Sequence, residues 1–440
     1  MNADNLDEDV RRLLELVSPK VGVLRSLTKV VRGVEEPNPP IVYQAVLSHF
    51  DYRIAPQLER SAAGKGRTDS EAIRAALGEA IEHYCASHVN KETTRIASWG
   101  ELPNAVAPPE CVLYSDAQYA RPRFPYHRWQ SQDVLTWTPM RELPMDREVF
   151  APAQQIYLNF TAQREEDFLA TITSNGLAAG PDLDFAILNG LYECVERDGF
   201  LITWMNKLPA PEVDFSASNG LARSIKEHYA QHETEIRIFN VSTNIPIYVM
   251  MAVALDKTGA GPAVLVGLGC HLDPQVALIK SLLEICQVHP GEVSRYKEEP
   301  PAQRLRSYED VRTLEDHSAF LTVPERIGEC SFLLDSGRVQ PIEELPNHSR
   351  GSAAADLQTV VDALGRAGCR VLYADLTTPD VTDYGFRVVR AIATGLQPIH
   401  FGYGEERLGG RRLFEVPYVL GHATAVRGEN DLNPCPHPLA

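Results

Sequence analysis

The sequence predicts an α+β fold with mixed or antiparallel sheets. Short apolar segments of alternating polarity, bounded by turn residues, predict strands at 155–160, 246–255, 262–268, 369–375 and 386–392. Apolar residues at helical spacing predict helices interspersed with these strands, at 68–90, 182–206, 273–288 and 353–367. With 440 residues, the chain is long enough for two or three compact lobes.

The order of these patterns indicates how the chain is organised. A short amphipathic helix at 7–17 precedes a strand-rich stretch at 19–31. The stretch 94–155 is rich in proline, aromatic and turn residues, so we expect loops and short strands that link two lobes there. We predict an N-terminal helix, one main domain and a tail, at 1–17, 18–420 and 421–440.

The composition argues against several classes of protein. The formal net charge of −17 disfavours a general nucleic-acid binder, because attraction to phosphates depends on Lys and Arg. The eight cysteines form no C-x-x-C pair, so neither a zinc ribbon nor a disulfide framework is indicated. The acidic start is not a signal peptide, and no apolar run approaches the roughly 20 residues that span a bilayer. We expect a cytoplasmic protein that does not bind membranes.

An internal repeat is the most informative feature of the sequence. Residues 66–83 can be laid over residues 180–197 without a gap, and each copy has a Gly turn, a polar first helical turn, Ala-Ile and then E-x-x-E followed by a cation. A weaker third copy at 271–287 ends in E-x-x-Q. The N-caps that these helices offer are Thr68 or Asp69, and Asp182 or Asp273.

The repeated glutamates suggest a cation site. Glu79 and Glu82 lie one helical turn apart, and Glu193 and Glu196 repeat this spacing. Two carboxylates about 5 Å apart repel by roughly 3 kcal/mol at an effective dielectric constant near 20, so four together would need cations or raised pKa values. Mg²⁺ with a polyphosphate suits such a cluster. The alternative is that E-x-x-E marks the solvated face of an amphipathic helix; two copies in one register weigh against it.

Three further segments have features of a binding or catalytic site. Lys65 lacks the spacing of a P-loop, so that interpretation fails. The small-residue turn from Ser174 to Gly180 precedes the second helix and can present backbone amides to an anion, although an ordinary tight turn explains it equally well. His271 follows Gly-Leu-Gly-Cys and fits a structural turn residue better than a base or ligand.

These motifs, in this order, resemble the YcaO family over roughly residues 18–400. The resemblance rests on Gly64-Lys65-Gly66, which the family has as a turn, and on Glu79-x-x-Glu82, Ser174-Asn175-Gly176, Ala179-Gly180, Glu193-x-x-Glu196-Arg197, Gly267 to Gln287, Ser18 to Arg25 and Asp375 to Asp380. It implies a YcaO-type α+β fold in which the repeated glutamate-bearing helices surround an ATP site.

The resemblance also implies an activity. ATP with Mg²⁺ phosphorylates a peptide amide oxygen after a Cys, Ser or Thr side chain has attacked the preceding carbonyl, and loss of phosphate leaves a thiazoline or oxazoline. On this view Glu79, Glu82, Glu193 and Glu196 hold Mg²⁺, and Arg197 neutralises phosphate charge. The resemblance places further nucleotide contacts at Lys20, Lys65, Arg74, Ser174, Glu193, Lys280, Glu284 and Gln287.

The tail carries a second signal. Pro434, Pro436 and Pro438 form the P-x-P-x-P pattern typical of azoline-forming members, where it orders the active site; the alternative is a frayed, extended end. Because the similar region begins near residue 18, we expect a separate partner that binds the leader of the precursor peptide, in a complex that can include a flavin dehydrogenase.

The sequence departs from the family pattern at several positions, and alternatives stay open. Ala75 and His83 replace Ser and Arg in the first motif, and Lys280 replaces Arg in the third helix. Pro181 and Phe185 stand where the family often has Asn and Glu, although Asp182 or Asp184 can compensate for Phe185. The alternatives to azoline formation are thioamide or amidine chemistry, and a catalytically weakened docking scaffold.

Overall fold

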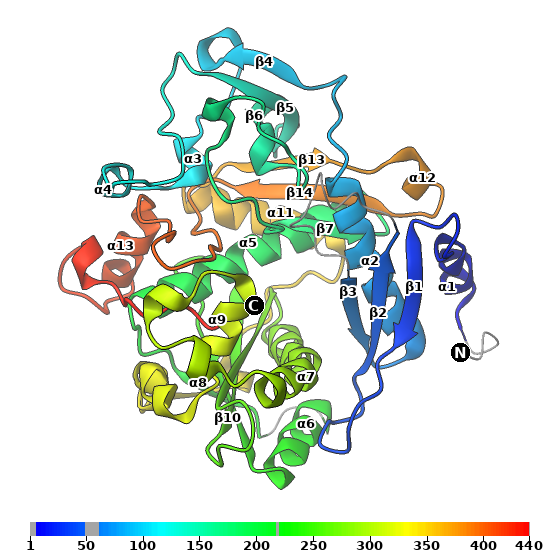
Figure 1. The fold of residues 1–440 in the computed structure, drawn as a ribbon, viewed down its shortest axis with the longest axis vertical. Helices are drawn as coiled ribbons and strands as arrows, with labels where there is room; N and C mark the ends of the chain where they lie inside the picture. Colours follow the sequence, from blue (N-terminus) through cyan, green and yellow to red (C-terminus); the bar gives the residue numbers. More distant parts are fainter. Residues whose placement is uncertain (1–5, 49–60, 217–219, 440) are drawn as a thin grey trace. The chain divides into compact units, whose positions relative to one another are not determined.

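The computed structural model describes residues 6–48, 61–216 and 220–439, which form two compact units (Figure 1). Unit 1 comprises Met1–Val31, Pro39–Cys194 and Ser352–Gly395. Unit 2 comprises Arg32–Asn38, Val195–Gly351 and Leu396–Ala440. Both units contain helices and largely antiparallel sheets, so the predicted α+β class is confirmed. In the described part of the chain, no helix is both long and apolar enough to cross a membrane.

Unit 1 is built on two sheets. A three-stranded antiparallel sheet has the order β1-β2-β3, and a six-stranded sheet has the order β4-β5-β13-β14-β7 with β6 paired to β5. Helix α2 lies along β3 and β2, as the blue region of Figure 1 shows. The elements are α1 (Glu8–Leu13), β1 (Leu24–Lys29), β2 (Ile41–Leu47), β3 (Ser61–Gly66), α2 (Asp69–Ala86), β4 (Arg95–Ser98), α3 (Pro109–Val112), α4 (Asp116–Tyr119), β5 (Val134–Leu143), β6 (Arg147–Pro152), β7 (Leu177–Gly180), α11 (Ala353–Arg366), β13 (Val371–Asp375), α12 (Pro379–Thr382) and β14 (Arg387–Ala393).

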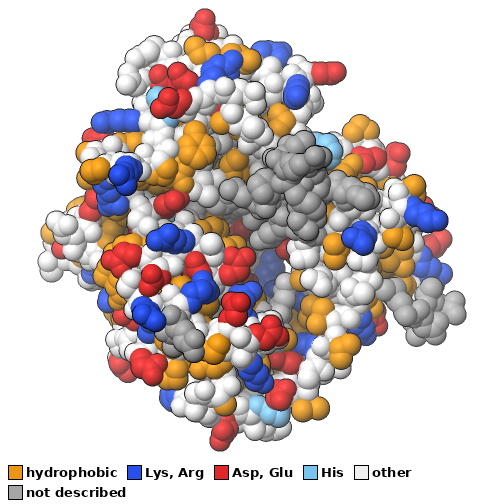
Figure 2. Space-filling model, in the orientation of Figure 1, with side chains coloured by type: hydrophobic (Ala, Val, Ile, Leu, Met, Phe, Trp, Pro, Cys, Tyr) orange, Lys and Arg blue, Asp and Glu red, His pale blue; other side chains and the backbone are white. Residues whose placement is uncertain are grey.

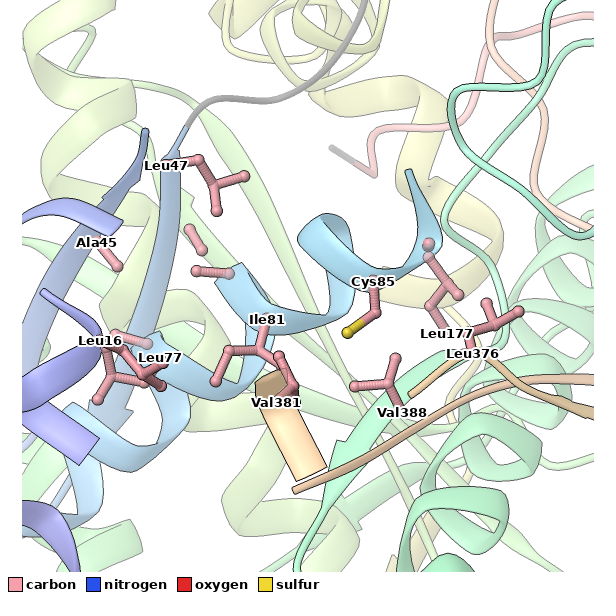
Figure 3. Close-up of a cluster of buried hydrophobic side chains, with 14 of the residues drawn as sticks. Leu16, Ala45, Leu47, Leu77, Ile81, Cys85, Leu177, Leu376, Val381 and Val388 are labelled. Carbon is pink, nitrogen blue, oxygen red and sulfur yellow. The ribbon is translucent and has the colours of Figure 1, made fainter. Parts of the chain in front are cut away.

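The main core of unit 1 forms around α2. Its apolar side chains recur at helical spacing, and Leu77, Ile81 and Cys85 are fully buried. Figure 3 shows Ile81 beside Val381, and the other labelled side chains come from α2 itself, from both sheets, from the segment after β13 and from the 3₁₀ turn that ends at Leu16. Burial of this apolar stripe fixes α2, and therefore the glutamates on its other side, against the strands.

Unit 2 has one five-stranded sheet of order β11-β10-β9-β8-β12, with α6 and α7 packed on it. Every residue of β10 except the last is buried, as expected for a central strand. Helix α5 (Leu183–Met205) begins in unit 1 and continues into unit 2 after Cys194. The other main elements are β8 (Glu212–Asp214), α6 (Gly220–Gln231), β9 (Thr234–Asn240), β10 (Tyr248–Asp256), β11 (Val264–His271), α7 (Pro274–Glu298), α8 (Pro301–Arg304), α9 (Leu314–Phe320), α10 (Ser331–Leu334), β12 (Val339–Pro341) and α13 (Arg411–Val419).

Most predicted helices and strands are present, but one strand is not. The strand predicted at 155–160 is wrong, because a 3₁₀ turn (Ala153–Gln155) and an irregular segment occupy it. There the carbonyl of Ile156 accepts a hydrogen bond from the Arg390 guanidinium and needs no strand partner. Residues 94–155, predicted to link two lobes, lie within unit 1.

Helix α7 runs ten residues beyond its predicted end at residue 288, through Pro290. Proline has no N–H, so the carbonyl four residues earlier, that of Cys286, loses its helical donor. Arg32 replaces that donor, with its guanidinium nitrogen 2.6 Å from the Cys286 oxygen. The same device appears in α13, where Asn206 donates to the Leu413 carbonyl that Pro417 leaves free.

Candidate functional site

Each copy of the sequence repeat forms a strand followed by a helix. Strand β3 precedes α2, β7 precedes α5 and β11 precedes α7. The helices lie so close to the strands that a Cβ added at Gly64 or Gly269 would overlap helix backbone. Gly64-Lys65-Gly66 therefore belongs to strand β3 and is not the predicted turn, because its two glycines provide close helix packing rather than a change of direction.

The helices also begin as the sequence predicts. Thr68 caps α2 by accepting the Glu71 N–H, and Asp273 caps α7 by accepting the N–H groups of Gln275 and Val276. Asp182 accepts the Phe185 N–H at the start of α5. His271 accepts the N–H of Asp273 at its Nδ1, which fits the turn role expected from the sequence.

The first glutamate of each motif accepts a backbone N–H from the strand or loop that precedes its helix. The donor lies 16 or 17 residues earlier in every copy, which gives the repeat a common geometry. The three bonds are Ala63 N to Glu79 Oε2 at 3.2 Å, Gly176 N to Glu193 Oε2 at 2.9 Å and Leu268 N to Glu284 Oε2 at 3.3 Å. These carboxylates therefore help to join helix and strand, which an exposed helix face would not do.

Glu82 is a carboxyl group of unit 1 whose surroundings disfavour its charge. Burial raises its pKa well above the usual range, and the charges of Glu79 and Glu193 raise it further. A hydrogen bond from the Ala179 N–H, 2.7 Å from Oε1, opposes this. Of the four carboxylates predicted from the repeats to converge, Glu79 and Glu193 thus lie close enough to Glu82 to repel its charge.

Arg390 shapes the loop that bonds to Glu193. Its guanidinium donates to the carbonyls of Ile156, Thr173 and Asn175, at 3.1, 2.8 and 2.6 Å. The Ala391 N–H donates to the carbonyl of Gly176. Gly176 has a positive φ of 85°, and in this conformation its N–H points to the Glu193 carboxylate. Strand β14 therefore holds both sides of the Ser174-Asn175-Gly176 turn.

Sequence reasoning missed Arg390. The residue is 2% exposed, and its burial lowers the guanidinium pKa to about 10, while the charge of Glu193 opposes this effect. A buried cation costs several kcal/mol unless it is paired or hydrogen-bonded. The three carbonyls and the nearby Glu193 carboxylate offset this cost for Arg390. The available signal was an Arg within an apolar strand pattern at 386–392, where a cation needs such partners.

The carboxylate cluster fits a hard divalent cation that takes only some of its ligands from the protein. Among residues 6–48, 61–216 and 220–439, no group of three or more His, Cys, Asp or Glu side chains is arranged to hold a metal ion by itself. Mg²⁺ usually takes one or two carboxylates and completes its shell with phosphate oxygens and water. The carboxylate oxygens of these glutamates, and the repulsion of Glu82 by Glu79 and Glu193, match that mode of binding.

In unit 2 the residues predicted to contact metal or nucleotide lie on α5 and α7. Glu196 pairs with Arg197, with 2.6 Å between carboxylate oxygen and guanidinium nitrogen. Lys280, Glu284 and Gln287 are partly exposed and follow the i, i+4, i+7 spacing of one helix face. The opposite face of α7 is buried in the core of unit 2. The three side chains predicted as nucleotide contacts thus share one accessible stripe.

Comparison with known proteins identifies the family. The family model described as YcaO cyclodehydratase, ATP- and Mg²⁺-binding, matches residues 63–397. The chain belongs to the YcaO family. An uncharacterized protein of Methanothermobacter thermautotrophicus is 28% identical to it over 355 residues, which are 79% of this chain and 84% of that protein.

Solved YcaO structures share the fold. A heterocyclase in complex with substrate and cofactor superposes with a TM-score of 0.82 at 26% identity, covering 98% of this chain and 57% of that one. This chain therefore spans little more than half the length of that heterocyclase. YcaO from Methanopyrus kandleri, bound with AMPPCP and Mg²⁺, gives a TM-score of 0.64 at 21% identity, over 89% of this chain and 90% of that one.

The other unit 1 residues expected at the YcaO nucleotide site lie in different surroundings. Lys65 is partly buried in β3, where strand alternation turns it away from α2. Lys20 is exposed in the turn before β1, and Ser174 is exposed in the turn held by Arg390. Arg74 instead binds two carboxylates near α1, those of Asp7 at 2.6 Å and Asp9 at 2.8 Å.

The departures from the YcaO pattern have a local structural context. Phe185, where the family often has Glu, is 39% exposed on the first turn of α5. Asp182, considered as a replacement, has one oxygen committed to capping that turn. Acidic and basic side chains are interspersed among uncharged ones over the face of the molecule in Figure 2.

Proposed function

We propose that this YcaO protein is an ATP- and Mg²⁺-dependent cyclodehydratase that converts Cys, Ser or Thr residues of a ribosomal precursor peptide into thiazolines or oxazolines. The observation that carries the proposal is the cluster of Glu79, Glu82 and Glu193, in which burial and, to a lesser extent, like charges raise the pKa of Glu82. A site that repels its own charges is suited to a cation, and the family is described as ATP- and Mg²⁺-binding.

In this proposal the residues of unit 1 position charge. Glu79, Glu82 and Glu193 hold Mg²⁺, and Arg390 keeps the Ser174-Asn175-Gly176 turn in place beside Glu193. Bound ATP supplies the phosphoryl group that turns a peptide amide oxygen into a leaving group. Phosphoryl transfer depends chiefly on positioning and charge neutralisation, which buried carboxylates and fixed backbone amides provide.

The predicted roles of Lys20, Lys65, Glu196 and Arg197 in this chemistry stay predictions, as do those of Arg74, Ser174, Lys280, Glu284 and Gln287. The same holds for Pro434, Pro436 and Pro438. We further propose that a leader-binding partner delivers the precursor peptide, and that a flavin dehydrogenase can act in the same complex. The formal net charge of −17 supports a basic partner or peptide.

The test combines the purified chain, partner, precursor peptide, ATP and Mg²⁺, and follows phosphate release and peptide mass. Loss of one water per modified Cys, Ser or Thr, with ATP consumed, supports the proposal. The matched control is Glu82→Gln, which removes one Mg²⁺ ligand and is expected to abolish both signals. Phosphate release with a mass change other than water loss would indicate thioamide or amidine chemistry. Unchanged mass and no phosphate release, with partner present, would leave a docking scaffold.

A further inference from the structure

Most of the tail that carries the three prolines is buried in unit 2, although it has no regular secondary structure. Residues 435–439 are all buried, and His437 is only 1% exposed. The residues that alternate with the prolines make the polar contacts. The tail is therefore held by side chains that the P-x-P-x-P pattern does not specify.

The first part of the tail binds the end of α5. The Asn433 N–H donates to the Met205 carbonyl at 2.7 Å, and its side-chain amide donates to the Trp204 carbonyl at 3.2 Å. The Trp204 indole N–H donates to the Cys435 carbonyl at 2.9 Å. None of these groups titrates near neutral pH, so these three hydrogen bonds favour seating of the tail but give it no pH dependence of their own.

The second part of the tail is held by histidines whose protonation states are fixed by their partners. The Gly402 N–H points at His317 Nε2 at 3.0 Å, so that nitrogen must accept. His317 Nδ1 then carries the proton and donates to the His437 carbonyl at 2.8 Å. His437 Nε2 donates to the His400 carbonyl at 2.7 Å, and its Nδ1 faces the Leu439 N–H at 3.4 Å. Both rings must be neutral for this chain of bonds to exist.

The rings also stack on one another. The centroids of His317 and His437 are 4.1 Å apart with an interplanar angle of 26°, and His400 lies edge-on to His437 at 4.8 Å. Protonation of either stacked ring would place a cation against its neighbour. It would also convert the accepting nitrogen into an N–H donor that faces another N–H donor. Each proton therefore removes a hydrogen bond and adds repulsion.

The charged groups around the histidines do not rescue a protonated ring. Arg197 and Arg407 disfavour a charge on His437 and His400, respectively. Asp316 favours a charge on His317, but it is already bound by Arg304 and by the N–H groups of Arg312 and Thr313. Burial is the largest effect, and it lowers the pKa of His317 to about 4 and that of His437 well below its usual range.

We propose that His317 and His437 are positioning residues that form a pH-sensitive latch, which seats the tail while both rings are neutral and releases it in mild acid. A released histidine binds a proton near pH 6.5, and the seated one does not. Seating is therefore fully favourable above about pH 6.5, and the ratio of seated to released tail falls as pH drops, by up to 10-fold per pH unit for each histidine. Any effect on catalysis rests on the proposed function, whereas seating is measurable without it.

The test is hydrogen exchange of the full chain, read by mass spectrometry at pH 7.5 and 5.5 and corrected for intrinsic exchange rates. Wild type is expected to lose at least about 10-fold of its protection in residues 429–439 at pH 5.5, while β10 stays protected. His437→Gln keeps a donor near the Nε2 position and cannot titrate, so its tail should be seated at pH 7.5 and lose much less protection in acid.

The matched control is His232→Gln, which changes an exposed histidine of unit 2 and should behave as wild type. His437→Ala removes the donor, and we expect the tail to exchange rapidly at both pH values. Three results would overturn the latch: protection in wild type that persists at pH 5.5, the same acid-induced loss in His437→Gln, or loss of protection in β10 together with the tail, since that is global unfolding.

Discussion

The carboxylate cluster of unit 1 makes a prediction that separates function from stability. Glu82→Gln removes a charge that Glu79 and Glu193 repel, while the amide oxygen of Gln can still accept the Ala179 N–H. We expect the variant to be more stable than wild type in the absence of nucleotide. We expect it also to lose the stabilisation that ATP with Mg²⁺ gives wild type, because one proposed ligand is gone.

The size of the gain follows from the geometry of α2. Side chains one turn apart have Cβ atoms about 5–6 Å apart, and two unit charges at about 6 Å repel by roughly 3 kcal/mol at an effective dielectric constant near 20. Glu82 can avoid part of this cost by binding a proton. We therefore expect the free energy of unfolding to rise by about 1–3 kcal/mol at pH 8.

The pH dependence has a definite sign. The folded-state pKa of Glu82 is raised, so its contribution to stability is fully present below the ordinary pKa of Glu and is lost as pH rises through the folded value. Glutamine does not ionise, so the variant does not lose stability in this way as pH rises. The difference between variant and wild type should be small at pH 5 and largest at pH 8, and taking this difference cancels the effect of the histidine latch.

Urea denaturation followed by circular dichroism, at pH 5 and pH 8, measures this difference. Glu92→Gln is the matched control, since it neutralises an exposed glutamate of the same unit. The reasoning would be refuted if Glu82→Gln were no more stable than wild type at pH 8, or if its gain were equal at both pH values. A gain in the control as large as that in Glu82→Gln would refute it too.

Three further predictions concern groups whose surroundings the structure defines. Arg390→Met leaves three carbonyls without their donor and should lower the urea unfolding free energy by about 3–5 kcal/mol, with Arg390→Lys intermediate. Gly269→Ala places a Cβ against the α7 backbone and should cost about 1–3 kcal/mol, measured as a lower melting temperature. Asp198→Asn weakens the pair that the fully buried Asp198 forms with Arg412 and should cost several kcal/mol by urea denaturation, whereas Arg411→Gln at the exposed neighbouring pair should be nearly neutral.

The sequence alone determined the elements that depend on local periodicity. The apolar stripes of α2 and α7 and the polar residues Thr68, Asp182 and Asp273 at helix starts lie within one or two turns of what they stabilise, so spacing reveals them. The same holds for the paired glutamates, whose recurrence in one register marked them before their surroundings were known. Their recurrence also matched the chain to the YcaO pattern.

Only the tertiary structure decided which distant groups complete these elements. Arg390 reaches carbonyls more than 200 residues earlier, and Arg32 supplies the donor that Pro290 takes from α7. His317 and His437 meet across 120 residues. A buried polar group must find a partner wherever the fold brings one, so its partner obeys no local spacing and the sequence does not display it.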